Sequence, residues 1–256
     1  MAMPLSKQNR QDLLARLIFE RGTVRVEELQ DALDVSAMTL YRDLAELESR
    51  HVITRSRGEV AAAASSLSET SFEFRLSQEL GVKNKLAEVA SQFVSRGNSV
   101  FVDDSTSAHF ALEKVMAGGP LTVLTNCLGT SDLVSTNAEA ELIMIGGRLH
   151  RRLNAFYGPS AQTALQAVQV DVALVGAAAV HEGLTHHPYE DVATFKRQIT
   201  RHANLSVLIV SRSKFERTAL YAVTPLADFD VIVTDMDLDN PHLQAAAEAG
   251  VRVLGP

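Results

Sequence analysis

A stretch of the chain between residues 36 and 57 carries side chains that could read a DNA duplex. Arg42 lies on an expected helix, on the face opposite Leu40 and Leu44. A guanidinium that points outward from such a helix can donate two hydrogen bonds to guanine O6 and N7 in the major groove. Hydroxyl and further basic side chains nearby could contact phosphates or the minor groove. The expected DNA-contacting set is Ser36, Met38, Thr39, Tyr41, Arg42, Arg50, Arg55 and Arg57.

A simpler interpretation competes with this one. An exposed arginine on an amphipathic helix usually does no more than solvate the helix. The preceding expected helix is also acidic, at Glu27, Glu28, Asp31 and Asp34. Positive charge nevertheless gathers on the helix that carries Arg42 and on the segment after it. The order of the elements and this local charge together favour DNA contact.

A second set of small, hydroxylated and charged residues follows the expected strands farther along the chain. In an open parallel sheet, ligands bind beyond the carboxyl ends of the strands. Residues 105–107 at a helix start would offer hydroxyls and free N–H groups to a phosphate. A lysine or arginine nearby could neutralise the anion. The strand ends supply Asp103, Asp104, Ser105, Thr106, Ser107, Thr125, Asn126, Gly146, Gly147, Arg148 and Lys214.

Members of this second set also have structural explanations when they are taken singly. Ser105 could only cap a helix, and Gly146 with Gly147 could only form a turn. Lys214 could pair with a surface carboxylate. Their clustering at the ends of successive strands is what favours a ligand site.

A metal site is not expected. His186 and His187 are adjacent in an expected loop beside Glu190 and Asp191, and they lack the helical i,i+4 spacing that would aim two histidines at one ion. Cys127 is the only cysteine, so an internal disulfide and a cysteine zinc cage are excluded. We therefore expect neither a metal nor a cofactor.

Composition indicates an ordinary globular protein. The chain has 256 residues, of which 46% are hydrophobic and 21% charged. The charged residues Lys7, Arg10, Asp12 and Arg16 break any apolar signal core near the start. No apolar run approaches the roughly 20 residues that span a bilayer. We therefore expect a cytoplasmic protein with no membrane partner. The net charge of −7 argues against nucleic acid only on average, because the local pattern decides.

The first sixty residues have the pattern of a winged helix-turn-helix, a mainly helical domain. One helical pattern ends at Gly22, a second begins near Val26, and a third spans residues 37–50 with Ser36 as its N-cap. A β-prone stretch at 51–55 and a turn at 56–58 follow. The positions expected to face the core are Leu13, Leu14, Leu17, Ile18, Leu29, Ala32, Leu33, Leu40, Leu44 and Leu47.

After residue 60 the pattern changes to alternating strands and helices. Buried apolar runs between helices predict an α/β domain with a mostly parallel sheet covered on both faces. Expected strands are 99–103, 121–125, 141–145, 170–175, 206–210, 230–234 and 251–254. Expected helices include 82–96, 161–168, 194–201 and 241–249. This gives a DNA-binding domain at 1–60, a linker at 61–74 and an effector-sensing and oligomerisation domain at 75–256.

Residues 35–58 resemble the signature of the DeoR family of bacterial transcriptional regulators, VSxxTIRRDLxxLE. The residues that fit are Val35, Ser36, Thr39, Arg42, Asp43, Leu44, Leu47 and Glu48. Tyr41 stands where the family usually has the first of two arginines, His51 replaces a glycine, and residues 57–59 replace His-Gly-Gly. These departures bear on the operator sequence and the wing contacts.

The resemblance extends over roughly residues 7 to 240, and it implies a second domain with the fold of ribose-5-phosphate isomerase that senses a phosphorylated sugar or a derivative. The family's DSGTT loop corresponds to residues 103–107, its TN to 125–126, its GG to 146–147 and its D-x-S-K-F to 211–215. Its GLT and following acid resemble residues 183–185 and Glu190, which adds Glu190 to the effector set.

Two departures concern the effector. Asp104 and Ser105 replace a small residue and a glycine, and Ser211 replaces an aspartate. A carboxylate beside a phosphate is unfavourable unless Asp104 turns away from it.

These inferences predict a transcription factor rather than an enzyme. The leading hypothesis is a repressor of a sugar or carbohydrate-derivative catabolic operon, a homo-oligomer (dimer or higher) that binds double-stranded operator DNA and is released by a phosphorylated sugar. One alternative is an isomerase- or hydrolase-like enzyme with an accessory DNA-binding head, using Asp103, Asp104, Glu190 and Lys214 as acid–base groups. Another is a constitutive DNA-binding protein whose second domain only oligomerises.

Overall fold

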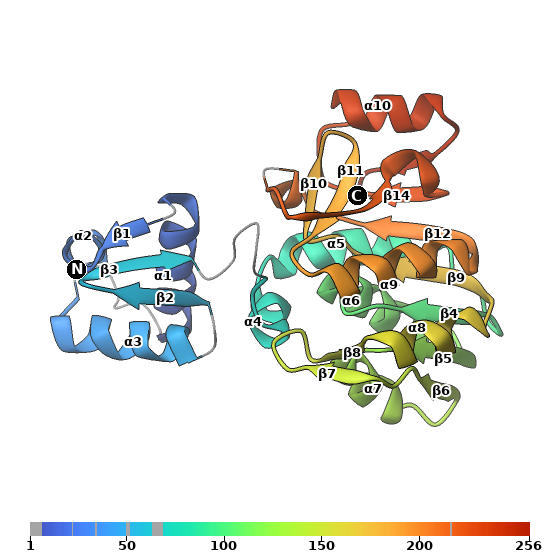
Figure 1. The fold of residues 1–256 in the computed structure, drawn as a ribbon, viewed down its shortest axis with the longest axis horizontal. Helices are drawn as coiled ribbons and strands as arrows, with labels where there is room; N and C mark the ends of the chain where they lie inside the picture. Colours follow the sequence, from blue (N-terminus) through green and yellow to red (C-terminus); the bar gives the residue numbers. More distant parts are fainter. Residues whose placement is uncertain (1–6, 22, 34, 50–51, 63–68, 216) are drawn as a thin grey trace.

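A computed structural model describes the chain apart from residues 1–6, 22, 34, 50–51, 63–68 and 216. It contains an N-terminal unit, residues 7–62, and a C-terminal unit, residues 69–256, with a short helix of the C-terminal unit lying between them (Figure 1). Among the described residues, no helix has both the length and the apolar character that a membrane span requires.

The N-terminal unit is a helix-turn-helix with a small antiparallel sheet of strand order β1-β3-β2. Its leucines Leu40, Leu44 and Leu47 are fully buried against α1 and α2, as their helical spacing predicts. The elements are α1 (Lys7–Arg21), β1 (Thr23–Arg25), α2 (Val26–Leu33), α3 (Ala37–Ser49), β2 (Ile53–Ser56) and β3 (Glu59–Ala62).

Two details of this unit differ from the sequence prediction. Strand β1 was not predicted, because three residues are too few to show an alternation of apolar and polar side chains. It forms by pairing with β3, with Val24 opposite Val60. Leu13 and Ala32 were expected in the core but are exposed. Ala32 lies at the outer edge of the apolar stripe of α2, and Leu13 faces the C-terminal unit, where it lines a cavity described below.

The C-terminal unit is built on a parallel seven-stranded sheet of order β15-β14-β12-β9-β4-β5-β6. All seven predicted strands are confirmed, and their ends shift by at most a few residues. They are β4 (Ser99–Val102), β5 (Leu121–Thr125), β6 (Ala140–Met144), β9 (Val170–Val175), β12 (Ala203–Ile209), β14 (Val231–Val233) and β15 (Arg252–Leu254).

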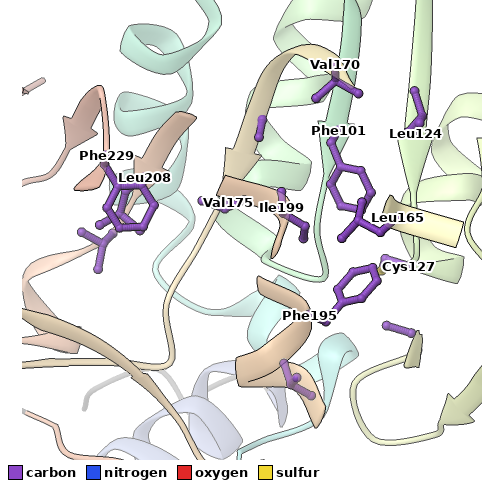
Figure 2. Packing of buried hydrophobic residues seen from close by; sticks show 14 of the residues in the cluster. Phe101, Leu124, Cys127, Leu165, Val170, Val175, Phe195, Ile199, Leu208 and Phe229 are labelled. Carbon is purple, nitrogen blue, oxygen red and sulfur yellow. The ribbon is translucent and has the colours of Figure 1, made fainter. Parts of the chain in front are cut away.

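Helices cover both faces of this sheet and form two apolar cores. One core contains Phe101 and Phe195, whose ring centroids lie 6.1 Å apart, with Cys127 close by (Figure 2). The other packs Leu86 and Leu112 against the opposite face. The helices are α5 (Leu80–Ser91), α6 (Thr106–Met116), α7 (Leu128–Ser135), α8 (Pro159–Gln166), α9 (Glu190–Arg201) and α10 (Pro241–Glu248).

Short elements complete the unit, and the sequence pattern did not predict them. Each is only three to six residues long. Such short strands show too little alternation of apolar and polar side chains to be recognised, and β11 also pairs with the distant strand β13. They are α4 (Phe72–Ser77), β7 (Arg148–His150), β8 (Ala155–Tyr157), β10 (Ala179–His181), β11 (Leu184–His187), β13 (Tyr221–Pro225) and two 3-10 turns, Arg212–Lys214 and Leu226–Asp228.

The segment expected as a linker, 61–74, has structure at both ends. Residues 61–62 belong to β3, residues 69–71 are buried, and residues 72–74 begin α4. Residues 63–68 lie outside the described part of the chain. The expected boundaries at 60 and 75 stay a prediction.

Candidate DNA interface and ligand cavity

Helix α3 presents a defined outer face because its other side is fixed by the core. Ser36 caps its start, since the Thr39 N–H donates to Ser36 Oγ at 3.2 Å. The Thr39 hydroxyl lies 2.9 Å from the same oxygen. The expected N-cap is therefore confirmed, and both hydroxyls lie at the exposed end of the helix.

The outer face of α3 carries the side chains that the sequence assigns to base contact. Met38 is 84% exposed and Tyr41 is 50% exposed. Arg42 is exposed beside them. Large apolar side chains that are exposed together on one face often mark an interaction site, so this face has the character of a contact surface. The geometry is compatible with major-groove entry, while the individual base contacts stay predictions.

A buried ion pair that the sequence reasoning did not single out fixes the orientation of α3. Asp43 is fully buried, and its carboxylate accepts from Arg10 Nε of α1 at 2.5 Å and from Gln11 Nε2 at 3.4 Å. The sequence signal for this buried pair is an acidic residue, Asp43, at a position between the core-facing leucines of α3. The pair ties α3 to α1 and so sets the direction in which Arg42 points.

The three basic residues expected around the wing differ in their surroundings. Arg55 donates to Glu48 through Nε at 2.8 Å and Nη2 at 2.5 Å, and these bonds lower the pKa of Glu48. Arg57 is exposed at the tip of the β2–β3 hairpin, with a φ of 49°. Arg50 lies outside the described residues. Arg57 is thus better placed for DNA than Arg55, which holds the wing to the end of α3.

A cavity of about 1040 Å³ lies at the carboxyl ends of β4, β9 and β12. The sheet order places β4 beside β9, while β5 and β6 continue on its other side, so the cavity occupies a topological switch point. Of the expected effector residues, those that line it are Asp104, Ser105, Thr106, Ser107 and Lys214. These five residues therefore lie together at one edge of the sheet, as the sequence predicts.

Other expected effector residues lie elsewhere. Thr125 Oγ1 donates to the Val102 carbonyl at 2.7 Å, and Asn126 Nδ2 donates to the Phe156 carbonyl at 2.9 Å, so both fix the loop after β5. The structure does not bring into the cavity Thr125, Asn126, Gly146, Gly147, Arg148 or Glu190. Their part in ligand binding stays a prediction.

Basic residues that the sequence reasoning missed line the same cavity. They are Arg75 of α4, Lys83 of α5, Lys196 of α9 and Arg217. Lys83 and Lys196 are each 5% exposed and lie on the buried faces of their helices. A lysine on an apolar helix face was the signal that could have identified them. Over the described residues, five cationic side chains and three carboxylates line the cavity.

Lys196 organises the loop after β4. Its ammonium pairs with Asp103 and lies 2.8 Å from Asp104 Oδ1. Burial alone would lower the pKa of Lys196, but the two carboxylates raise it. Asp103 also accepts the N–H groups of Ser105 at 2.8 Å and Gly176 at 3.0 Å. Asp103 is thus a structural anchor beneath the cavity.

Asp104 faces the cavity but its charge is compensated. Burial would raise its pKa, whereas Lys196 and then Arg75 lower it. Lys196 and Arg75 therefore compensate the negative charge of Asp104, the carboxylate that distinguishes this loop from the family's pattern, so that it does not repel an anionic ligand unopposed. Position 176, beside this loop, requires a glycine, because a Cβ there would lie only 2.1 Å from Ser105 Oγ.

Two lysines in the cavity have low pKa values. Burial, followed by repulsion from Lys214, lowers the pKa of Lys83 to about 7. Burial lowers the pKa of Lys214 to about 8, although Glu69 at 4.0 Å opposes the shift. Crowded cations of this kind are stabilised by an added anion. The start of α6, with Thr106 and Ser107 at the cavity wall, adds free N–H groups for the same charge.

The histidines considered as metal ligands do not assemble a metal site. His187 lines the cavity and accepts the Tyr189 N–H at 3.2 Å, and burial lowers its pKa to about 3. His186 instead contacts the Ala219 carbonyl at 3.1 Å. Across the described residues, no group of three or more His, Cys, Asp or Glu side chains is arranged to hold a metal ion.

Two family models match the chain. The model described as a DeoR-like helix-turn-helix domain matches residues 10–66, and the model described as the DeoR C terminal sensor domain matches residues 78–236.

Individual relatives agree with these models. The HTH-type transcriptional regulator GlpR of Haloferax volcanii is 31% identical over 255 residues, covering 98% of each chain. The glycerol-3-phosphate regulon repressor of Escherichia coli is 25% identical over 233 residues, covering 90% of this chain and 92% of that protein. These relatives are transcriptional regulators and not enzymes.

A solved structure is similar to part of the chain. Ribose 5-phosphate isomerase A from Methanocaldococcus jannaschii has 17% sequence identity and a TM-score of 0.38, with 52% of this chain and 53% of that chain covered.

Proposed function

The chain belongs to the DeoR family of helix-turn-helix transcriptional regulators, and from this premise we propose that it is a cytoplasmic repressor of a carbohydrate-related operon whose effector is a phosphorylated sugar or sugar derivative. The effector occupies the cavity of the C-terminal unit. The N-terminal unit binds operator DNA, with Arg42 reading bases and Arg57 contacting the backbone.

The observation that carries the effector proposal is the group of buried cations around the start of α6. Lys83 and Lys214 have lowered pKa values because burial and neighbouring cations disfavour their charged forms. A phosphate between them and the N–H groups at Thr106 would relieve that repulsion. The remaining volume, within a cavity of about 1040 Å³, is ample for a sugar.

The proposed sign of regulation rests on the relatives. One relative is named as the repressor of a glycerol-3-phosphate regulon, and glycerol 3-phosphate is a small phosphorylated polyol. A ligand can release a repressor only if it binds the DNA-incompetent arrangement more tightly. A homo-oligomer with two N-terminal units would match two half-sites of a palindromic operator, and the effector would change the spacing between those units.

The effector proposal is tested by calorimetry with a panel of phosphorylated sugars and polyols. We expect one member to bind, and we expect Lys214→Ala and Thr106→Ala to weaken that binding. Lys85→Ala is the matched control, because Lys85 is exposed on α5 and does not line the cavity. Absence of binding across the panel would contradict the proposed effector class and favour a constitutive DNA-binding protein.

A further inference from the structure

Helix α4 places three of its first four side chains in three different environments. Phe72 is buried in the core of the C-terminal unit, where a Cβ on Gly129 would lie only 2.3 Å from its ring. Phe74, two residues later, belongs to the apolar core of the N-terminal unit. Arg75 lines the ligand cavity. A single six-residue helix thus touches both cores and the site.

The contact between α4 and the N-terminal unit reaches the cavity itself. Phe74 is 4% exposed and clusters with buried residues that include Leu14 and Leu40. Phe74 and Leu13 of α1 are both among the lining residues of the cavity. One lining residue of the cavity, Leu13, therefore comes from the unit that carries the DNA-contacting face, and Figure 1 shows α4 lying between that unit and the sheet.

On the cavity side, polar contacts with charged groups hold α4 in place. Arg75 donates to the Asp104 carbonyl at 3.2 Å and pairs with its carboxylate at 3.4 Å. The ammonium of Lys83 donates to the Arg75 carbonyl, near the end of α4. Within the described part of the chain, Arg75 Nε is buried and has no acceptor within hydrogen-bond distance. These groups are the ones that an anionic ligand would attract.

We propose that α4 couples the cavity to the DNA-binding unit, with Arg75 exchanging Asp104 for the ligand's anionic group and Phe74 carrying the change into the core of the N-terminal unit. This inference rests on the proposed function, because it requires an anion in the cavity. Arg75 is a positioning residue here: it acts on DNA binding through Phe74.

The physical basis is a competition for the same donors. A phosphate recruits Arg75 and Lys83 through charge-assisted hydrogen bonds, which are stronger than the bond from Lys83 to a neutral carbonyl. Loss of that bond and of the Asp104 pair frees α4 from the cavity wall. Because Phe74 is packed in the dense core of the N-terminal unit, α4 cannot shift without moving or loosening the residues of that core. Ligand binding would thereby favour one of two arrangements of the N-terminal unit.

The test uses tryptophan fluorescence, because the chain contains no tryptophan. Phe74→Trp in the full chain places a single reporter at the proposed coupling contact. The protein is titrated with inorganic phosphate, or with the panel member that binds, while calorimetry on the same sample measures binding. We expect the emission to change with the midpoint that calorimetry gives. Tyr41→Trp is the control, because that side chain is exposed and does not belong to the cluster that contains Phe74, and its emission should stay constant.

A second comparison separates coupling from binding. In the Phe74→Trp background, Arg75→Gln should reduce the emission change at ligand concentrations that calorimetry on the same variant shows to be saturating. If Phe74→Trp does not fold, hydrogen exchange of the unmodified chain replaces it, and amides of α1 and α4 should change their exchange rates on ligand addition.

The outcomes distinguish this inference from the proposed function. Calorimetric binding with constant emission, or with unchanged exchange in α1 and α4, overturns the coupling role of α4 and leaves the effector site intact. No binding of phosphate or of any panel member overturns the proposed effector and the exchange at Arg75 together.

Discussion

The candidate DNA-contacting face and the ligand cavity use charged side chains in opposite ways. In the N-terminal unit, Arg42 and Arg57, which are expected to contact DNA, lie in water. In the C-terminal unit, several of the charges around the cavity are buried, and Lys196 is both buried and paired with Asp103 and Asp104. The first arrangement suits a large polyanion that approaches from outside, and the second suits a small anion that enters the protein.

The difference has energetic consequences. Exposed charges interact weakly with their neighbours and are screened by salt, so an exposed arginine can be replaced without harm to the fold. Removing one partner of a buried pair leaves an uncompensated charge in a poorly solvated place. Mutations in the two charge sets should therefore affect different properties, namely DNA affinity in the first and stability with ligand binding in the second.

The largest expected effect is at Lys196. Lys196→Met leaves Asp103 and Asp104 without their shared cation, and we expect the free energy of unfolding of the C-terminal unit to fall by about 3–5 kcal/mol. Urea denaturation followed by circular dichroism measures this change. Arg201→Met, at an exposed position near the end of the same helix, should have little effect. Equal stability of the Lys196 variant and the unmodified protein would show that the pair contributes nothing.

The next effect is on DNA and not on stability. Arg42→Ala should weaken binding to a duplex selected from a random library by about 1–3 kcal/mol and relax the preference at one base position, because a bidentate base contact is lost. Its unfolding midpoint should not move. Fluorescence anisotropy measures the affinity, and Arg201→Ala provides a charge-matched control. Unchanged affinity and unchanged sequence preference would exclude Arg42 from base reading.

A smaller effect is expected from pH on effector affinity. Lys83 and Lys214, with pKa values of about 7 and about 8, face Arg75, Arg217, Glu69 and Glu79. An anion favours their charged forms, so binding takes up protons, and affinity should fall as pH rises through these values. The expected loss from about pH 7 to about pH 9 is roughly tenfold, or about 1.4 kcal/mol. A phosphate monoester is already a dianion over this interval, since its second pKa is about 6.

Calorimetry in two buffers of different ionisation enthalpy measures the proton uptake directly. Lys83→Met should reduce the number of protons taken up, while Lys85→Met should leave it unchanged. Affinity that is constant over this range would mean that neither lysine contacts the anion.

The smallest effect is expected at an exposed ion pair of the N-terminal unit. Lys7 and Glu46 lie 2.7 Å apart with much of each side chain in water. Lys7→Met should lower the free energy of unfolding by less than about 1 kcal/mol, in contrast with the buried pair at Lys196. Urea denaturation of both variants provides the comparison, and a loss at Lys7 as large as that at Lys196 would remove the distinction between the two charge sets.

The same contrast explains how much could be predicted from sequence. The outer face of α3 follows from helical spacing, because Leu40, Leu44 and Leu47 determine which side is buried. The seven strands of the sheet follow from their apolar runs between helices. Ligands bind beyond the carboxyl ends of parallel strands, and this rule predicts Ser105 and Thr106 at the cavity because it needs only the local order of strand and helix.

The remainder of the cavity could not be predicted in this way. Arg75 and Lys83 come from the consecutive helices α4 and α5, whereas Lys196 comes from α9, far along the chain, and only the tertiary fold brings the three together. Thr125 and Asn126 also lie at the end of a strand, β5, but β5 is on the side of β4 away from β9, and their side chains bond to the backbone carbonyls of Val102 and Phe156. The position of a residue at the end of a strand does not show whether that strand borders the switch point, because this depends on the order of the strands in the sheet.

The central claim is that an anion in the cavity of the C-terminal unit controls DNA binding by the N-terminal unit. The most direct measurement is the affinity of the full chain for its selected duplex, by fluorescence anisotropy, with and without the phosphorylated compound that calorimetry identifies. We predict weaker DNA binding in its presence, and a much smaller response for Lys214→Ala. An affinity that stays constant at saturating ligand would contradict the account.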